Sequence, residues 1–493
     1  MHLSQEIRAW SPGLEHEVPV LLRTSLLTVL LVAFPGSVRA QSPATQGSTR
    51  PPAPTSTAPG TPAGAPAPPV PAPPAQPATQ PDVTRVLHLE EAIQVAVANQ
   101  PSLVQSRAAA AASEAQTIVS RSPLLPQASA VASFQRLHRR VPTSTTGTGS
   151  QVVCLSSTCN NWNIGLNGSQ TLWDPVDFAS WEASKHTAEA SNATARTTLK
   201  NVVLSVRTTF FAARATRDLV RVAQETLGNQ IAHLRQVEGF VRVGTQPEIA
   251  LALARLNVAN ARVSLITAQN NDRIAKAQLN QAMGSTEGTD YQVADDELPT
   301  LEEESQPLPG LFDIALGSRP ELASLEYARQ AQGKVLDSTR WQWSPSLSFG
   351  GGYSKTGLSL DALYDTWNFG FTLTWNFLQG GFTTGQIKVA EQNLRVATAA
   401  VGVEQLQVRF EVEQAQATLL ANKESLTAAQ DAVVNAKEQL RLAEGRYQTG
   451  VGTIIELSDA QLQATQASAQ LVQAQYNVST ARAQLLAALG RGE

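Results

Sequence analysis

The clearest indication of the fold is an alternating stretch of eleven residues. It reads Trp367-Asn368-Phe369-Gly370-Phe371-Thr372-Leu373-Thr374-Trp375-Asn376-Phe377. Large apolar residues fill every odd position and small or polar residues every even position, a period of two that is typical of a β-strand. An apolar, aromatic face opposite a small polar face over about ten residues fits a transmembrane β-strand. A strand of a soluble β-sandwich is the alternative interpretation of the same pattern.

Three further segments carry a related alternation, so the chain is predicted to contain four such strands. They are expected at about 127–136, 161–173, 345–355 and 366–377. Four strands cannot close a barrel, and an open sheet edge is not tolerated in lipid. The smallest common barrels have about eight strands. If these strands cross a membrane, several copies of the chain must therefore share one barrel.

The strands belong to a unit that occurs twice in the chain. Residues 238–284 match 444–490 at 18 of 47 positions. The two units, 83–284 and 311–490, flank an acidic linker at 285–310. In each unit a helical stretch (88–122 or 311–341) precedes two strands and a long helical hairpin. The repeat predicts a mainly α-helical fold with a small β part, built from a duplicated helix-strand-strand-long-hairpin unit.

Seven-residue spacing in the hairpins predicts coiled-coil packing, because a sustained heptad repeat keeps one seam of a helix against its partner. One seam is rich in alanine, which permits close approach. In the second unit the two seams are Leu457, Ala464, Leu471, Val478 and Leu485, and Ala460, Ala467, Ala474, Ala481 and Ala488. The partner helices, about 178–238 and 383–445, contain no proline and could extend about 90 Å at 1.5 Å per residue.

The N-terminal region predicts export. Residues 25–34 are apolar and follow Arg23, and Val38-Arg39-Ala40 ends with the small-residue spacing of a signal-peptidase site. Residues 1–40 are therefore predicted to be a signal peptide. Fourteen of the 28 prolines lie within the following segment, 41–82, which is predicted to be a disordered tether. The net charge of 37 − 41 = −4 does not favour nucleic acid as a partner.

At the end of the second hairpin, Glu456 and Asp459 lie three residues apart and share a helix face. By spacing alone, they fit the acidic start of a solvated helix, where the helix dipole favours negative charge. The first unit has Ala250 and Leu253 at the equivalent positions, so the acidic pair belongs to one repeat only.

The motif Arg446-Tyr447-x-x-Gly450-x-x-Thr453-x-x-Glu456, together with Trp375-Asn376-Phe377-Leu378-Gln379-Gly380-Gly381, resembles the TolC-like outer-membrane efflux protein family. The resemblance covers about residues 85–490. It implies a homotrimer in which a twelve-stranded transmembrane β-barrel stands on a long periplasmic α-helical barrel. It also implies a passive exit duct in the outer membrane, in contact with its lipid, with a periplasmic adaptor and an inner-membrane transporter as partners.

The same resemblance assigns roles to the hairpin ends. Glu456 and Asp459 would form an acidic constriction at the periplasmic entrance, and Tyr447 would help to hold that entrance closed. A basic partner that some relatives have after the hairpin end is replaced here by Gly452. The positions that relatives present to the adaptor are Gly244, Thr245, Gly450, Val451 and Gly452.

The remaining candidates are few. Cys154 and Cys159 are predicted to form a disulfide in the loop between the first two strands, because an exported pair is normally oxidised. The histidines lack metal-ligand spacing, and no catalytic constellation emerges, so we expect no enzyme activity, metal or cofactor. A structural coiled-coil surface protein without a conduit is the alternative function. It explains the helices and leaves the duplicated strand pairs unexplained.

Overall fold

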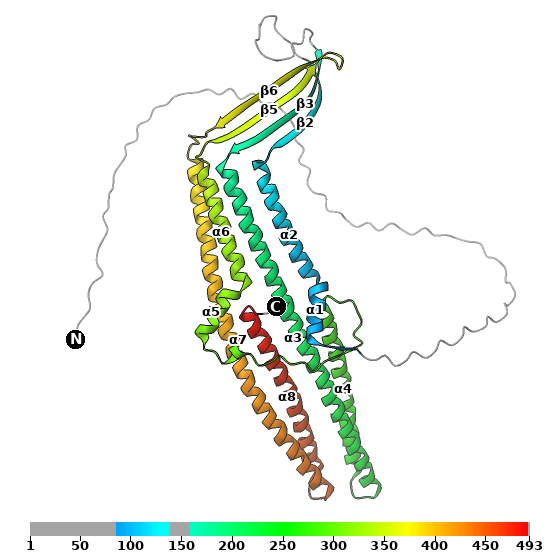
Figure 1. Ribbon diagram of the computed structural model, residues 1–493. Helices are drawn as coiled ribbons and strands as arrows, with labels where there is room; N and C mark the ends of the chain where they lie inside the picture. Colours follow the sequence, from blue (N-terminus) through cyan, green and yellow to red (C-terminus); the bar gives the residue numbers. More distant parts are fainter. Residues whose placement is uncertain (1–84, 139–157, 492–493) are drawn as a thin grey trace, which may run out of the picture. The chain divides into compact units, whose positions relative to one another are not determined.

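The computed structural model describes residues 85–138 and 158–491, which belong to one compact unit (Figure 1). The predicted signal peptide, residues 1–40, and the predicted tether, residues 41–82, lie outside the described residues. Within them the chain is mostly helical with a small sheet, as the sequence predicts.

The same order of elements occurs twice. The first half contains β1 (Arg85–Leu87), α1 (Leu89–Asn99), α2 (Pro101–Arg121), a short 3₁₀ turn, β2 (Gln127–His138), β3 (Thr158–Trp173), α3 (Pro175–Arg242) and α4 (Glu248–Met283). The second half contains β4 (Tyr291–Val293), a second 3₁₀ turn, α5 (Leu308–Ser318), α6 (Pro320–Trp341), β5 (Ser346–Gly357), β6 (Leu363–Thr374), α7 (Phe382–Gln448) and α8 (Ile454–Ala488).

Proline interrupts both of the shorter helical stretches. The sequence predicts one helical stretch over 88–122 and another over 311–341, but each divides into two helices, before Pro101 and before Pro320. A proline ring disfavours the helical conformation of the preceding residue. Gln100 and Arg319 are accordingly extended, with ψ of 117° and 121°.

The four long strands form one antiparallel sheet in the order β2-β3-β5-β6. β6 ends at Thr374, although the alternating pattern continues to Phe377. Thr374 pairs with Ser346, the first residue of β5, which follows Pro345. Since proline has no backbone N–H to donate, the ladder stops there. The indole Nε1 of Trp375 instead donates to the carbonyl oxygen of Trp343, at 3.0 Å.

Two long helices connect the sheet to the hairpin ends (Figure 1). α3 has 68 residues and α7 has 67, so each is about 100 Å long at 1.5 Å per residue. α4 packs against α3 and α8 against α7, which forms the two antiparallel hairpins, and α3 also contacts α8. The alanine seam lies inside the second hairpin, where Ala460, Ala467, Ala474, Ala481 and Ala488 are all buried.

α4 is unusually apolar for a helix that is paired on one side only. Among the described residues it is the one helix long and apolar enough, by length and composition alone, to cross a membrane. Its alanines Ala250, Ala254 and Ala261 are buried, while Ile249, Leu256, Val263 and Ile266 are exposed. The helix therefore has one apolar side inside its hairpin and another apolar side that none of the described helices covers.

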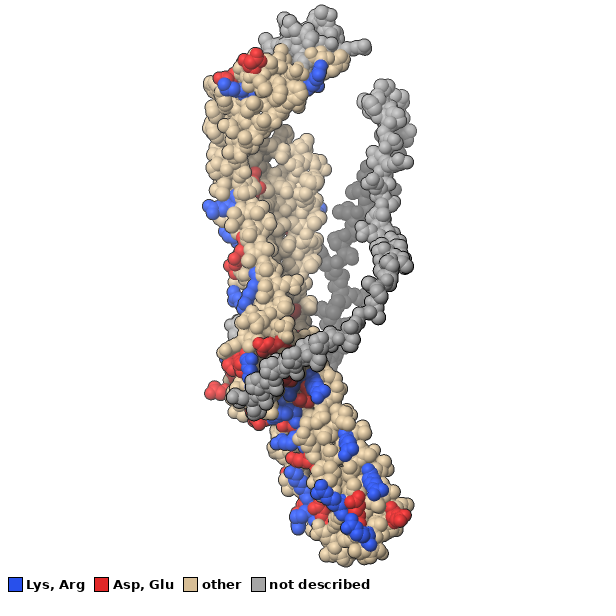
Figure 2. All heavy atoms as spheres, turned by 90° about the vertical axis from the view of Figure 1, so that its right-hand side faces the viewer, with Lys and Arg blue, Asp and Glu red and all other residues tan. Residues whose placement is uncertain are grey.

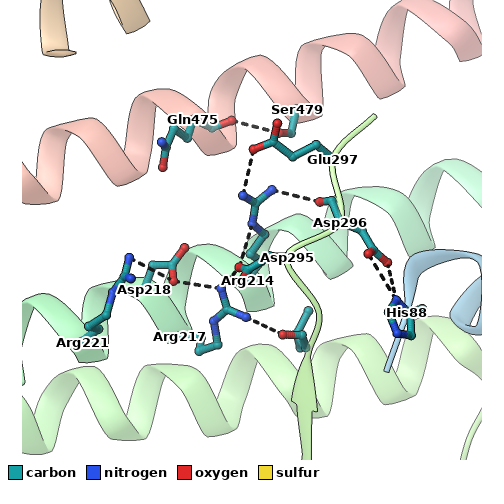
Figure 3. Close-up of polar contacts among 11 residues, drawn as sticks. His88, Arg214, Arg217, Asp218, Arg221, Asp295, Asp296, Glu297, Gln475 and Ser479 are labelled. Carbon is teal, nitrogen blue, oxygen red and sulfur yellow. Dashed lines mark hydrogen bonds and ion pairs between the residues drawn. The ribbon is translucent and has the colours of Figure 1, made fainter. Parts of the chain in front are cut away.

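The acidic linker is held against the helices by basic side chains, midway along the long helices (Figure 3). Arg217 of α3 binds Asp295, and Arg214 binds Glu297 at 2.9 Å and the Asp296 carbonyl oxygen at 2.9 Å. Next to these residues, β1 and β4 form a two-stranded parallel sheet. Charge complementarity thus places the linker, which the sequence showed only as an acidic segment.

The buried end of the linker is Glu304, whose side chain is 5% exposed. Its carboxylate binds Arg482 of α8 at 2.9 Å, and it also pairs with Lys423 of α7. Burial by itself raises the pKa of this carboxyl group. The hydrogen bonds from Lys423 and the Leu301 amide, with the charges of Arg482 and Lys423, outweigh burial and lower the pKa below its ordinary value of 4.5.

Replacing Arg482 with alanine should lower the free energy of unfolding by about 2 kcal/mol, because the buried Glu304 carboxylate loses one of its two charged partners and a hydrogen bond to a charged group contributes about 1.5–3 kcal/mol. The midpoint of urea denaturation, followed by circular dichroism in detergent, measures the effect. Arg441→Ala is the control, since its ion pair with Glu438 is exposed, and its midpoint should barely change. Equal shifts in the two variants would contradict the interpretation.

Acid should weaken the same contact in the unchanged protein. Because the folded-state pKa of Glu304 is lowered, its contribution to stability is complete above pH 4.5 and is lost as the pH falls through the folded-state value. Glu304→Gln should therefore unfold with a smaller pH dependence below about pH 4.5 than the unchanged protein.

Candidate functional site

The sheet has one apolar and one polar face, and the register aligns them across the strands. Trp162 of β3 lies opposite Phe134 of β2, and Tyr353 of β5 lies opposite both Leu166 of β3 and Trp367 of β6. The apolar face is open to the surroundings, since Trp367 is 71% and Phe369 is 66% exposed. Such an extended aromatic surface is costly in water and is typical of a surface that contacts lipid.

The opposite face of the sheet carries small and uncharged side chains. Asn163, Gly165 and Asn167 of β3 lie on it beside Thr356, Ser354 and Gly352 of β5. The hydroxyl group of Thr356 donates to Asn163 Oδ1 at 3.3 Å. In Figure 2, most of the sheet surface in view carries no charged side chain, and charged residues gather on the helical part. A wall of this composition suits the lumen of a water-filled channel.

Close packing on the apolar face depends on a glycine. The Phe369 ring lies over Gly351, and a Cβ atom built at Gly351 would be 2.2 Å from Phe369 Cδ1. The pair Gly351 and Phe369 is in register between β5 and β6. The aromatic side chain therefore covers a strand position that has no side chain of its own.

The sheet also has two open edges. Within the described residues, β2 pairs on one side with β3, and β6 pairs on one side with β5. The N–H and C=O groups on the outer sides of β2 and β6 thus have no strand partner in this chain. In hydrocarbon each such group costs several kcal/mol, which open sheets avoid by closing into barrels.

The two hairpin ends turn in the same way. Gly244 and Gly450 adopt positive φ angles of 81° and 79°, which glycine tolerates without steric cost. The next amide, of Thr245 or Val451, donates to the carbonyl oxygen five residues before it, at 3.0 Å in both turns. This is the Schellman arrangement that ends a helix. Thr245 and Val451 are exposed at the ends of the hairpins, so both are accessible to another molecule.

Gly452 has a packing role in the second turn. A Cβ atom at this position would be 3.0 Å from the Arg446 backbone carbon, so a larger residue would push the turn apart. The amide of Gly452 also donates to the Arg446 carbonyl oxygen at 2.9 Å.

Tyr447 is buried between the two hairpins. It packs with Ala443, Leu457 and Ala460 of its own hairpin and with Phe240 of α3. Its ring also lies edge-on to the imidazole of His233 of α3, with 5.4 Å between the ring centroids. Burial raises the pKa of the Tyr447 phenol, so the group stays neutral. The structure therefore places this residue in the contact that joins the second hairpin to α3.

The two carboxylates at the start of α8 differ in their surroundings. Glu456 forms an ion pair with Arg446, with 3.2 Å between Oε1 and Nε, across the turn of the same hairpin. Asp459 is exposed and, within the part of the chain that the structure describes, has no hydrogen bond or ion pair. The family resemblance implies a basic partner after the turn, where this chain has Gly452, but the basic partner of Glu456 lies before the turn, at Arg446.

Asp459 borders a groove of about 700 Å³ that runs over α3 between α4 and α8. Amide and hydroxyl side chains line much of it, including Gln230, Asn257 and Thr465. Asp459 is the one charged residue in that lining. The groove begins beside the acidic end of α8, next to the hairpin ends, and Leu219, Val222 and Leu462 supply apolar parts of its wall.

Two other candidates add no site. The disulfide predicted between Cys154 and Cys159 cannot be assessed, since Cys154 and the side chain of Cys159 lie outside the described residues. Within the described ranges, no group of three or more histidine, cysteine, aspartate or glutamate side chains is arranged to hold a metal ion.

These features describe one kind of architecture: an antiparallel sheet with an exposed aromatic face and two edges that no described strand pairs, carried on paired helical hairpins. The sequence matches the family described as outer membrane efflux protein over residues 92–285 and 311–491. The chain belongs to this family. It is therefore a protein of the outer membrane that extends into the periplasm.

Individual relatives are distant in sequence. The chain is 25% identical to the solvent efflux pump outer membrane protein SrpC of Pseudomonas putida, over 58% of this chain and 62% of that protein. It is 26% identical to the pyoverdine export outer membrane protein OpmQ of Pseudomonas putida, over 82% and 86%. The crystal structure of the Campylobacter jejuni CmeC outer membrane channel shares the fold, with a TM-score of 0.71 and 21% identity, over 82% and 86%.

The apolar face provides a matched pair of variants. Phe369→Arg should reduce the amount of folded protein in outer membranes, because an arginine facing lipid near the midplane costs about 2–4 kcal/mol. Asn368→Arg, on the neighbouring residue and the opposite face, should be tolerated. Heat-modifiable protein in outer-membrane fractions is the measurement. If both variants accumulate equally, the assignment of the faces is wrong.

Proposed function

We propose that this chain is the outer-membrane channel of a tripartite efflux or type I secretion system. In this proposal three copies join their sheets into a twelve-stranded barrel, and their helices form a tunnel across the periplasm. The observation that carries it is the sheet itself, with one exposed apolar face, one uncharged face and two open edges. Pairing β6 of one chain with β2 of the next satisfies both edges at once.

The helical part supports the same assembly. The uncovered apolar side of α4 needs a partner outside its own hairpin, and a neighbouring copy supplies one in the trimer. The resemblance to the family supplies the number three. The alternative, a coiled-coil surface protein, leaves the open sheet edges without a partner.

The duct is passive in this proposal. An inner-membrane transporter supplies the energy, and a periplasmic adaptor connects it to the hairpin ends at Gly244, Thr245, Gly450, Val451 and Gly452. The relatives are named for solvent efflux and for pyoverdine export, substrates of very different chemistry. An uncharged lumenal wall suits such a range, because it offers no strong binding site to any one substrate.

The function is tested in outer-membrane fractions and planar bilayers. We expect trimers that dissociate only on heating and that conduct ions after reconstitution. A soluble product that does not conduct would overturn the channel proposal and favour the surface protein.

The entrance is proposed to be narrowed by the carboxylates of Glu456 and Asp459 from three chains, with Tyr447 holding the second hairpin in place. Rings of acidic side chains bind cations in a pore. The two positions should contribute unequally, because Arg446 already compensates the charge of Glu456 at 3.2 Å.

Block of the channel by a trivalent cation distinguishes the contributions of Glu456 and Asp459 to cation binding. Asp459→Asn should raise the half-blocking concentration of lanthanum about tenfold, equivalent to about 1.4 kcal/mol of lost binding. Glu456→Gln should change it less, and the double variant should resemble Asp459→Asn. Single-channel recording with lanthanum on the periplasmic side is the measurement. Unchanged block in Asp459→Asn would remove this residue from the constriction.

A further inference from the structure

His233 occupies an unusual place for a histidine. It lies on α3, is 5% exposed, and packs edge-on against Tyr447 of α7, which is 4% exposed. The contact joins the first hairpin to the second, close to the proposed entrance. No pattern in the sequence around His233 points to a role for it.

Two polar atoms in this contact are buried without a partner. Among the described residues, neither His233 Nε2 nor the Tyr447 hydroxyl oxygen has a hydrogen bond. A buried polar group without a partner costs about 1–3 kcal/mol. Apolar packing and the ring contact therefore stabilise the contact. Both polar atoms would regain hydrogen bonds with water if the hairpins separated.

His233 continues a row of polar contacts along α3. Gln230 Nε2 donates to Gln461 Oε1 of α8 at 2.9 Å. One turn further away, the hydroxyl oxygens of Thr226 and Thr465 are 3.2 Å apart. Residues three and four apart lie on one side of a helix, so Thr226, Gln230 and His233 form a single seam that faces the second hairpin.

Burial lowers the pKa of His233, and a hydrogen bond with Gln236 opposes part of that effect. No charged side chain contributes to the shift. The titratable and charged side chains nearest in sequence on the packed helices are Glu225, Arg235 and Glu238 of α3, Glu248 and Arg255 of α4, Lys437, Glu438, Arg441, Glu444, Arg446 and Tyr447 of α7, and Glu456 and Asp459 of α8. None of these carboxylates forms an ion pair or hydrogen bond with His233, so a proton on the imidazole would have no compensating charge.

We propose that His233 is the positioning residue that ties the second hairpin to the first at the entrance, and that its protonation releases this tie. This inference rests on the proposed channel function. A closed entrance keeps the imidazole neutral and buried against Tyr447, whereas an open entrance exposes it to water. Acid therefore favours the open arrangement.

The direction follows from proton linkage. In the separated state the imidazole has an ordinary pKa of about 6.5, and in the closed state its pKa lies below that value. The separated state thus binds a proton first as the pH falls. The stability of the closed contact is complete above about pH 6.5 and is lost as the pH falls through the closed-state pKa.

The test compares conductance at about pH 7.5 and about pH 5.5, on either side of the ordinary histidine pKa. Trimers of the unchanged chain should show an open probability at least about fivefold higher in acid, the lower end of usual coupling between two states. His233→Phe keeps a ring of similar size and cannot take a proton, so its open probability should not rise. His186→Phe, at another histidine of α3, is the control and should respond like the unchanged chain.

Two results would overturn the inference: no acid response in the unchanged chain, or a full response in His233→Phe. Tyr447→Ala, which removes the packing partner of His233, shows whether a negative result comes from the role of His233 or from failure of the channel itself. If neither this variant nor the unchanged chain conducts at either pH, the channel proposal fails. If they conduct and acid has no effect, only the role of His233 fails.

Two further measurements do not depend on the folding of His233→Phe. Histidine hydrogen–deuterium exchange on unchanged trimers should give His233 a pKa below the ordinary 6.5, and a value at or above it would contradict the proposal. Gln230→Cys with Gln461→Cys, joined by a short bis-methanethiosulfonate, should abolish the acid response by holding α3 to α8. Linked channels that still open in acid would exclude the seam as the moving contact.

Discussion

The rest of the structure depends on the requirement that backbone hydrogen bonds be satisfied in lipid. A sheet of four strands with an aromatic face can lie in a membrane only if its edges are paired, and no strand among the described residues pairs them. In the proposed assembly, the outer groups of β2 and β6 pair with those of other copies of the chain. In the proposed trimer, pairing these edges between chains closes the barrel. The small, uncharged face of each sheet then lines the lumen.

The helices meet a different requirement. A helix of 67 or 68 residues cannot be covered along its whole length by one domain core, so α3 and α7 acquire different partners along the way. Near the sheet they pack with α2 and α6, and beyond the linker they form the hairpins with α4 and α8. The alanine seam allows the close approach within the second hairpin. Midway, Arg214, Arg217 and Arg482 bind the acidic linker and hold the two halves of the chain in place.

The entrance combines contacts of different strength. Arg446 and Glu456 form a partly exposed ion pair, which contributes little in water. His233 and Tyr447 form a buried contact that leaves two polar atoms without partners. Such a contact separates more easily than a fully hydrogen-bonded one, because both polar atoms regain hydrogen bonds with water when the two hairpins move apart.

Much of the architecture follows from local patterns. The period of two at Trp367–Phe377, the heptads of the hairpins and the repeat between 238–284 and 444–490 each predict an element from neighbouring residues, because side-chain direction in a strand or helix depends on spacing alone. The ends of elements were less predictable. β6 stops at Thr374 because Pro345, just before the partner strand, cannot continue the ladder. This end therefore depends on a pairing between two separate segments of the chain.

The kinds of element, their order and their duplication could all be predicted from patterns in the sequence. Which residues meet near the hairpin ends became clear only from the folded chain. Gln230 meets Gln461, His233 meets Tyr447, and Arg446 rather than a residue at position 452 pairs with Glu456. The physical reason is that such pairs depend on how two hairpins pack side by side. That packing sums many small contacts along the helices, and no local spacing in the chain encodes it.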